Sequence, residues 1–491
     1  MNDKGLTAWQ LTMLALGTVI GGSFFLGSAV AVKAAGPAVI IAFVAGGALV
    51  YVILYALSEM TVADPAAGSF RTYAEKAYGP AAGFIVGWVY WTGLVLAMSS
   101  EAIAVSTLLR SWIPGVSVPV IGMAIIVLVT LLNLLGADRL SKLESGLAAV
   151  KLLAIAGFAV LGIILAGGFL AGSAPVESGL SGAYPLFPGG IGGLAGSMLI
   201  VMFCYAGFEV IGLAATETAD PHRTVPRAIT YTVVGVIGLY VSAISVLLLL
   251  VPAGVLKTDE SPFVTAMTAW GYPGAGQLIN IVLVTAILST MLAAMFGLGR
   301  MLRSLAEENH APAWLKDEGD IPYRGILSSG AAMLAGLGLG LLLPQQVYLF
   351  LVSSGGFSLL FSYFIILLAH YRLRSEQGCP PAGACQLPGF PAVSWISLAG
   401  ILLIIISMPL IPGQGAGLFA GIGFIALFSL LYVITRKAGE QAANESPYGD
   451  REPLGKSCAN RLQFETAEEI VPEKIEKRQS AGSTGEGPDK D

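Results

Sequence analysis

The sequence predicts an all-α membrane protein with about twelve transmembrane helices, and three observations lead to this prediction. Of the 491 residues, 55% are hydrophobic and only 12% are charged, which is too apolar for a soluble domain. Apolar stretches long enough to cross a hydrocarbon core of roughly 30 Å follow one another between Trp9 and Thr435. These stretches lack the polar and apolar alternation of a membrane β-barrel, so helices are the remaining way to satisfy the backbone in lipid.

The expected spans lie near residues 10–35, 38–63, 83–109, 117–136, 145–169, 192–217, 227–251, 275–304, 326–344, 346–370, 393–411 and 414–435. The first stretch continues to full span length without a cleavage pattern, so we expect a membrane helix there and not a signal peptide. From about Gly439 the chain is hydrophilic and poor in apolar residues. We therefore expect a membrane domain at 1–438 and a disordered cytoplasmic tail at 439–491.

Basic residues are unevenly divided between the two sets of connecting segments. Most Lys and Arg fall on the side of the N-terminus, whereas Lys33, Arg110 and Lys257 fall on the other. The positive-inside rule then places both termini in the cytoplasm, as expected for a multi-pass protein of the plasma (inner) membrane. The net charge of −5 gives no reason to expect a nucleic-acid partner, and the oligomeric state stays open.

Cysteine and histidine spacing indicates neither disulfides nor a metal site. Cys379, Cys385 and Cys458 fall on the predicted reducing side, and the C-x5-C pair after His370 has no second His or Cys pair beside it. All three histidines lie at predicted cytoplasmic helix ends, where we expect them to be solvated. The spans also lack HExxH and nucleophile-elbow motifs. We expect no cofactor, no metal and no catalytic residue.

Small residues interrupt two of the predicted spans, the first at residues 17–23 and the sixth at residues 205–209. Five spans separate the two starts, so the second set of five would cross the bilayer inverted relative to the first. Paired interruptions of this kind indicate a substrate site near the midplane, because unwound backbone is tolerated there only where it lines a cavity. Freed amides at a half-helix start favour an anion such as a carboxylate. Close packing through small residues is the alternative explanation.

Two charged residues within the predicted spans are the main functional candidates. An ionised carboxylate near the bilayer centre costs on the order of 3 kcal/mol, so Glu209 is expected to carry a proton, to cap the resuming half-helix, or both. Lys151 lies roughly 10 Å into the fifth span. It either snorkels to the inner interface or is buried as an ammonium in place of a bound cation.

Three further carboxylates are secondary candidates. Glu101, in the outer half of the third span, is expected to line an outer vestibule or to hydrogen-bond a neighbouring helix. Glu59 and Glu217 lie at inner span ends, where ion pairs with nearby basic residues would anchor or gate the helices. The expected partners are Arg71, Arg223 and Arg227.

Several motifs together resemble those of a known family. They are ALGTVIGGSFFLGSA (15–29), EMTVADPAAGSFRTYAEKAYG (59–79), GWVYW (87–91), GFEVIGLAATETADPHRTVPRAI (207–229) and GRMLRSLAEENHAPAWL (299–315). With them the chain resembles amino acid permeases of the amino acid–polyamine–organocation superfamily, in the bacterial amino acid transporter branch. The resemblance implies a leucine-transporter-type fold. Its two inverted five-helix repeats would occupy about 10–169 and 192–370, with two extra helices at about 393–435.

The resemblance also implies roles for residues at the two breaks. Backbone amides at the first break would hold the substrate carboxylate, and carbonyls at the second would hold its ammonium. The residues concerned are Gly21, Gly22 and Ser23 in the first break, and Tyr205, Ala206 and Gly207 in the second.

Coupling and gating residues follow from the same resemblance. Lys151 corresponds to a fifth-span lysine that replaces sodium in similar transporters, and Glu209 to the carboxylate of the family's Gly-Phe-Glu; both are expected to couple transport to protons. Phe24, Tyr205 and Phe208 are candidate gates or pocket walls, with simple packing as the alternative. The usual family pattern Ile-Gly-Thr-Gly-Leu-Phe is here Ile20-Gly-Gly-Ser-Phe-Phe25, which changes the pocket shape.

We therefore expect a secondary transporter that imports an amino acid with protons by alternating access, with the amino acid, protons and the lipid bilayer as its partners. An amino acid/amine exchanger and, from another class, a membrane-embedded sensor that signals through the tail are the alternatives. Sodium symport fits less well with a cation at Lys151. The sequence does not identify the amino acid.

Overall fold

The computed structural model describes residues 7–64, 66, 68–110, 112–167, 185–209, 211–212, 218, 220–257, 260–317, 319, 321–342, 347–378, 387–411 and 413–444. Its first half contains the helices α1 (Ala8–Val19), α2 (Gly22–Phe25), α3 (Gly27–Ala35), η1 (Gly36–Ala38), α4 (Val39–Ala63), α5 (Phe70–Tyr78), α6 (Pro80–Arg110), α7 (Val118–Asn133) and α8 (Ala137–Ala166). Its second half contains α9 (Gly190–Cys204), α11 (Pro221–Leu250), η3 (Ala253–Val255), α12 (Pro262–Ala269), α13 (Pro273–Glu307), η4 (Ala313–Leu315), α14 (Tyr323–Leu342), α15 (Val347–Gln377), α16 (Ala392–Ser407), η5 (Met408–Leu410) and α17 (Gly415–Asn444).

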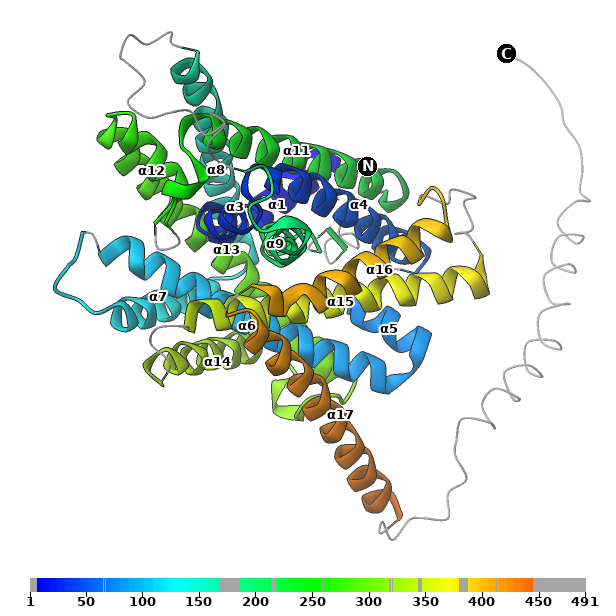
Figure 1. The fold of residues 1–491 in the computed structure, drawn as a ribbon. Helices are drawn as coiled ribbons and strands as arrows, with labels where there is room; N and C mark the ends of the chain where they lie inside the picture. The colour runs from blue at the N-terminus through cyan, green and yellow to red at the C-terminus, as the bar shows by residue number, and fades with distance from the viewer. Residues whose placement is uncertain are drawn as a thin grey trace, which may run out of the picture. The chain divides into compact units, whose positions relative to one another are not determined.

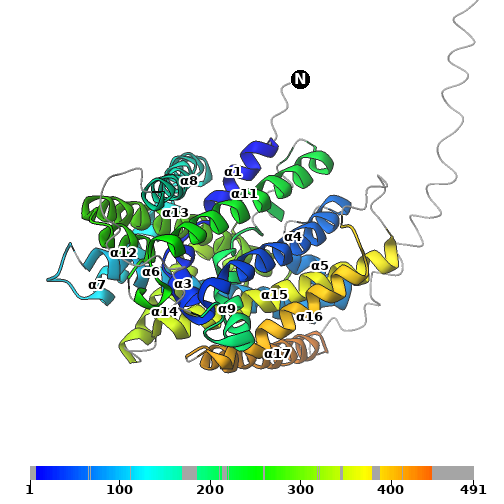
Figure 2. The same cartoon turned by 45° about the horizontal axis from the view of Figure 1, so that its top comes forward.

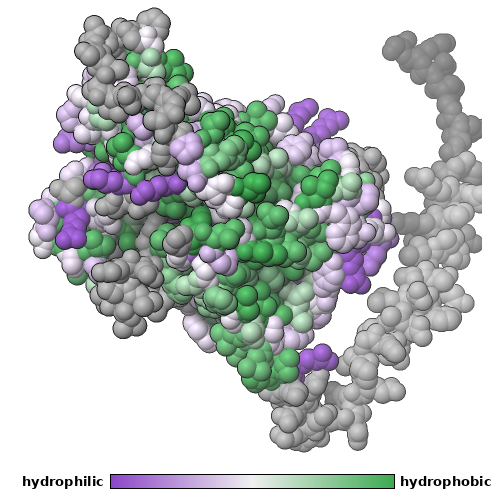
Figure 3. Space-filling view, viewed as in Figure 1, coloured by the Kyte–Doolittle hydropathy of each residue, from purple (hydrophilic) through white to green (hydrophobic). Residues whose placement is uncertain are grey.

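Eight segments among the described residues are long and apolar enough to cross a membrane, and α1, α7 and α9 are shorter apolar helices. These spans confirm the predicted all-α membrane fold, while the total of about twelve helices stays a prediction. The face in Figure 3 carries a broad apolar band with its most hydrophilic residues gathered toward the two ends. Such a surface suits a hydrocarbon layer between two aqueous phases.

Both predicted breaks are present. The first expected span is divided into α1, α2 and α3, because Ile20 and Gly21 adopt extended backbone between Val19 and Gly22. The sixth expected span leaves its helix after Cys204, and residues 205–209 form turns. The two spans interrupted by small residues are therefore the ones that lose regular backbone hydrogen bonding.

The helices around these breaks pack in two groups. Helix α11 contacts α1, α4 and α8, whereas α6 contacts α7, α13, α14 and α15. Helix α15 also runs along α4, α5 and α16, so it links the two groups (Figures 1 and 2). The chain separates into one compact unit at Met1–Tyr432 and a second at Val433–Asp491. Most of the expected tail, residues 445–491, lies outside the described residues.

A buried charged cluster joins the ends of α4 and α15. Glu59, 3% exposed, contacts Nε2 of His370 at 2.6 Å and accepts from Nη1 of Arg374 at 3.0 Å. The backbone N–H of Leu387 donates to the same carboxylate at 2.6 Å. The expected pairing of Glu59 with Arg71, Arg223 or Arg227 is therefore wrong, because α15 brings Arg374 to this position.

The same cluster corrects the expectation for His370. Its side chain is 1% exposed instead of solvated, since the ring is packed edge-on against Phe390. The cluster thereby fixes the segment before α16 to the ends of two long helices.

We expect Glu59→Gln to lower the free energy of unfolding by about 3 kcal/mol, because it leaves the largely buried Arg374 guanidinium, 14% exposed, without its counter-charge. The control is Glu376→Gln, which removes an exposed pair with Arg372 on the same helix and should cost less than about 1 kcal/mol. Unfolding of the purified protein in detergent measures both. Equal losses would show that the cluster does not stabilise the fold.

Candidate functional site

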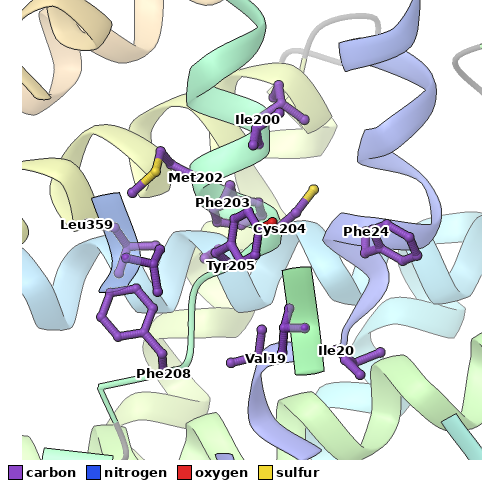
Figure 4. Close-up of a cluster of buried hydrophobic side chains, with 14 of the residues drawn as sticks. Val19, Ile20, Phe24, Ile200, Met202, Phe203, Cys204, Tyr205, Phe208 and Leu359 are labelled. Carbon is purple, nitrogen blue, oxygen red and sulfur yellow. The ribbon is translucent and has the colours of Figure 1, made fainter. Parts of the chain in front are cut away.

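The two breaks touch each other at Thr18 and Gly207. The Thr18 hydroxyl donates to the Gly207 carbonyl at 3.0 Å, and a Cβ added at Gly207 would stand 2.7 Å from the Thr18 carbonyl oxygen. Gly207 also has a φ of 104°, in the region that side chains disfavour. Glycine is required here both for its conformation and for the close approach. Figure 4 shows the irregular segment from Tyr205 to Phe208 near Val19 and Ile20.

The side-chain carboxylate of Glu101 is hydrogen-bonded to the Ser23 backbone amide, which we expect to bind the substrate carboxylate. Oε1 of Glu101 accepts from the Ser23 backbone N–H at 3.0 Å, and Glu101 is only 4% exposed. Its Oε2 lies against Gly22, where a Cβ would collide with it, and this oxygen has no hydrogen-bond partner among the described residues. Of the two expectations for Glu101, the hydrogen bond to a neighbouring helix is the one observed.

Lys151 is completely buried and does not snorkel. Its ammonium donates to the Gly17 carbonyl at 2.6 Å and to the Thr290 hydroxyl at 3.1 Å. The Thr290 hydroxyl in turn donates to the Ile20 carbonyl at 3.1 Å. Lys151 thus satisfies carbonyls that α1 frees where it ends, and places a positive charge beside the first break.

Glu209 is surrounded by hydrogen-bond donors. Its two oxygens accept from the Tyr90 hydroxyl at 2.8 Å and the Tyr363 hydroxyl at 3.2 Å, and the Gly207 N–H donates at 3.1 Å. The carboxylate therefore satisfies an N–H inside the second break and connects α6 and α15 to it. Because this donor precedes Glu209 in the chain, the contact is not the expected cap of the resuming half-helix.

The predicted aromatic gates are buried in ring contacts. Phe24 stacks on Tyr240 with centroids 3.9 Å apart, and Phe208 stacks on Tyr363 at 4.8 Å. The Tyr240 hydroxyl donates to the Cys204 carbonyl at 3.1 Å, which is freed at the end of α9. These aromatic rings pack around the two breaks and stabilise the irregular backbone there.

A cavity of about 70 Å³ opens beside the breaks. One wall is a stripe of α6 from Tyr90 to Glu101, and the opposite wall is a stripe of α13 from Thr290 to Ser304. Of the predicted site residues, Ser23, Ala206, Gly207, Glu101 and Glu209 line this cavity.

The remaining predicted residues lie behind the cavity or outside the described part of the chain. Gly21 and Gly22 pack against Thr290 and Glu101, and Tyr205 points its hydroxyl to the Phe43 carbonyl at 2.9 Å. Glu217 and the three predicted cytoplasmic cysteines lie outside the described residues. Phe24, Tyr205 and Phe208 are not among the described residues that line the cavity.

Comparison with known proteins assigns the family. A sequence model described as amino acid permease matches residues 10–441. The chain belongs to the amino acid permease family. The gamma-aminobutyric acid permease of Bacillus subtilis is 31% identical over 92% of this chain and 97% of its own. The amino acid permease YtnA of the same organism is 33% identical over 87% of this chain and 94% of its own.

The permease family fixes the class of activity. Its members are transporters and not enzymes, and the L-asparagine permease of Streptomyces coelicolor is 29% identical over 91% of this chain and 93% of its own. Among solved structures, a point mutant of the Eremococcus coleocola manganese transporter has a TM-score of 0.56 at 13% identity, covering 87% of this chain and 94% of that one. That likeness concerns the fold alone.

Sequence reasoning missed several residues of this permease site. Tyr90, Thr290 and Tyr363 are polar groups inside apolar helices, and that placement is the signal that was available. Their partners lie 119, 270 and 154 residues away in the chain. A single sequence gives no means of pairing residues at such separations.

We expect Gly207→Ala to destabilise the permease by about 2 kcal/mol or more, because the new Cβ meets the Thr18 carbonyl in a strained backbone conformation. Gly238→Ala is the matched control, since a Cβ there meets open space on α11 and alanine favours a helix. Thermal unfolding in detergent compares the two. A tolerated Gly207→Ala would mean that the breaks are not held in contact.

Proposed function

We propose that this permease is a proton symporter that imports an amino acid across the plasma membrane, with both termini in the cytoplasm. The observation that carries the proposal is the contact of the Glu101 carboxylate with the Ser23 amide at 3.0 Å. The substrate carboxylate is expected at the same amide. The protein therefore holds an internal carboxylate where an amino acid would place its own.

Competition for this amide provides a reason for proton coupling. When the substrate carboxylate takes the Ser23 amide, Glu101 loses its hydrogen bond while still buried at 4% exposure. A buried carboxylate without a partner costs several kcal/mol, and two carboxylates at one place repel each other. Binding a proton removes both penalties. Each substrate would thus enter with one proton on Glu101.

Lys151 and Glu209 take supporting roles in this mechanism. The Lys151 ammonium attracts the Glu101 carboxylate and holds the end of α1. We propose that it stands in for the sodium ion of sodium-coupled transporters. Glu209 already accepts from Tyr90, Tyr363 and the Gly207 N–H. We therefore assign Glu209 to holding the second break against α6 and α15, and we transfer the coupling role to Glu101.

The shape of the cavity supports alternating access. Its α13 wall runs from Thr290 to Ser304, a distance of about 21 Å at 1.5 Å per residue. Ser304 and Arg300 lie on the side where basic residues are concentrated in the sequence, which the positive-inside rule makes cytoplasmic. On the other side of the breaks, Phe24 packs against Tyr240 and Phe263. The described conformation is thus assigned as the one that faces inward.

Uptake of labelled amino acids into proteoliposomes tests the proposal. With an inward proton gradient we expect accumulation above the outside concentration, and without it only equilibration. A sodium gradient alone should drive nothing. Counterflow that continues without net uptake would identify an exchanger instead, and binding without any movement of label would favour a sensor.

We expect Glu101→Gln to abolish gradient-driven accumulation, because the amide side chain binds no proton near neutral pH. The loss should be at least about tenfold, corresponding to about 1.4 kcal/mol. Leu96→Met, on another face of the same helix and packed with Leu351, is the control and should accumulate like the wild type. Accumulation by Glu101→Gln at the wild-type level would remove Glu101 from the coupling mechanism.

A further inference from the structure

The cavity beside Glu101 has an apolar wall. Between Glu101 and Tyr90, α6 presents Leu94, Ala97 and Met98 to the cavity. Phe203 of α9 and Leu359 of α15 also line it, and both belong to the apolar cluster drawn in Figure 4. Met98 and Ala97 precede Glu101 by three and four residues, so they lie on the same face of the helix one turn away. A substrate whose carboxylate replaces Glu101 would meet these side chains first.

Most polar side chains in the deep part of the cavity are already occupied by protein partners. The hydroxyls of Thr18 and Thr290 donate to backbone carbonyls, and that of Tyr90 donates to Glu209. The Ser23 hydroxyl stands at the amide that receives the carboxylate. No Asn or Gln is among the described residues that line the cavity.

The opposite wall leaves space for a side chain of limited size. Helix α13 contributes Ala293, Ala294 and Gly297 to the cavity, which are small and apolar. Met98, 5% exposed, is a long and adaptable side chain facing this space. The volume available to the substrate therefore depends on how far Met98 extends.

We propose that the permease carries neutral amino acids with apolar side chains, and that Met98 sets the upper size of the side chain. This inference rests on the proposed transport function and names its substrate class. A polar side chain would lose its water, and the hydroxyls of Thr18, Thr290 and Tyr90 that it meets deep in the cavity already donate to protein partners. An acidic side chain would meet the Glu209 carboxylate, and a basic one would place its charge against the apolar wall of Leu94, Ala97 and Met98.

The first test uses the wild-type protein in proteoliposomes, with labelled leucine and each of the twenty amino acids and γ-aminobutyrate as competitors. Competition should strengthen by about fourfold for each methylene buried, from alanine to valine to leucine. Asparagine, glutamine, lysine, glutamate and γ-aminobutyrate should compete at least about tenfold less well than leucine. Equal or stronger competition by any of these overturns the inference.

If labelled leucine is not taken up, each compound of the panel is supplied in labelled form and its uptake is measured directly. If asparagine, lysine or γ-aminobutyrate is transported and leucine is not, the substrate class is wrong while the transport function stands. If no compound on the panel is moved with or without a proton gradient, the proposed function itself fails.

The second test compares Met98→Ala with Leu96→Ala. Met98→Ala enlarges the cavity and should improve competition by phenylalanine relative to leucine by about tenfold. Leu96→Ala makes the same kind of truncation on α6, outside the described cavity wall, and should leave the ratio unchanged. Equal ratios in the two variants overturn the role of Met98. Should Met98→Ala fail to fold, Met98→Leu is tolerated by packing but extends less far into the cavity, so it should shift the ratio toward phenylalanine by a smaller factor.

Discussion

The structure depends on one constraint, the need to satisfy backbone groups that two broken helices expose inside a membrane protein. Water is scarce at this depth, so each unpaired N–H or C=O costs several kcal/mol. The protein supplies the partners from side chains of other helices. Lys151 and Thr290 serve the carbonyls at the end of α1, and Tyr240 serves the carbonyl of Cys204 at the end of α9.

These partners also determine how the helices are arranged around the breaks. Glu101 ties α6 to the first break, and Glu209 ties the second break to Tyr90 on α6 and Tyr363 on α15. Each contact joins a broken helix to a continuous one. The fold and the site therefore share the same hydrogen bonds, and a side chain that leaves its backbone partner changes both.

The fold and the position of the breaks could be predicted from the sequence because both depend on local sequence patterns. Span-length apolar stretches predict membrane helices, and the glycines around residues 21 and 207 mark where a helix loses regularity. What it missed are pairings between distant residues. Glu59 meets Arg374 at a separation of 315 residues and Glu101 meets Ser23 at 78. The predicted partners of Glu59 were chosen because they are basic, and charge alone does not decide which of several basic residues the packing brings near.

A site in which most polar groups already have protein partners has a consequence for transport. The binding free energy of a substrate is only the difference between the hydrogen bonds it forms and those it displaces. The substrate therefore binds with moderate affinity and can dissociate. In the proposed symport mechanism, the carrier must also return without substrate. If the Ser23 backbone amide had no partner, the conformational change of the substrate-free carrier would carry the cost of an unsatisfied N–H. When ionised Glu101 accepts from this amide, the N–H stays paired, and the carrier returns without a proton. The same carboxylate would then both lower the barrier for the empty carrier and prevent protons from crossing without substrate.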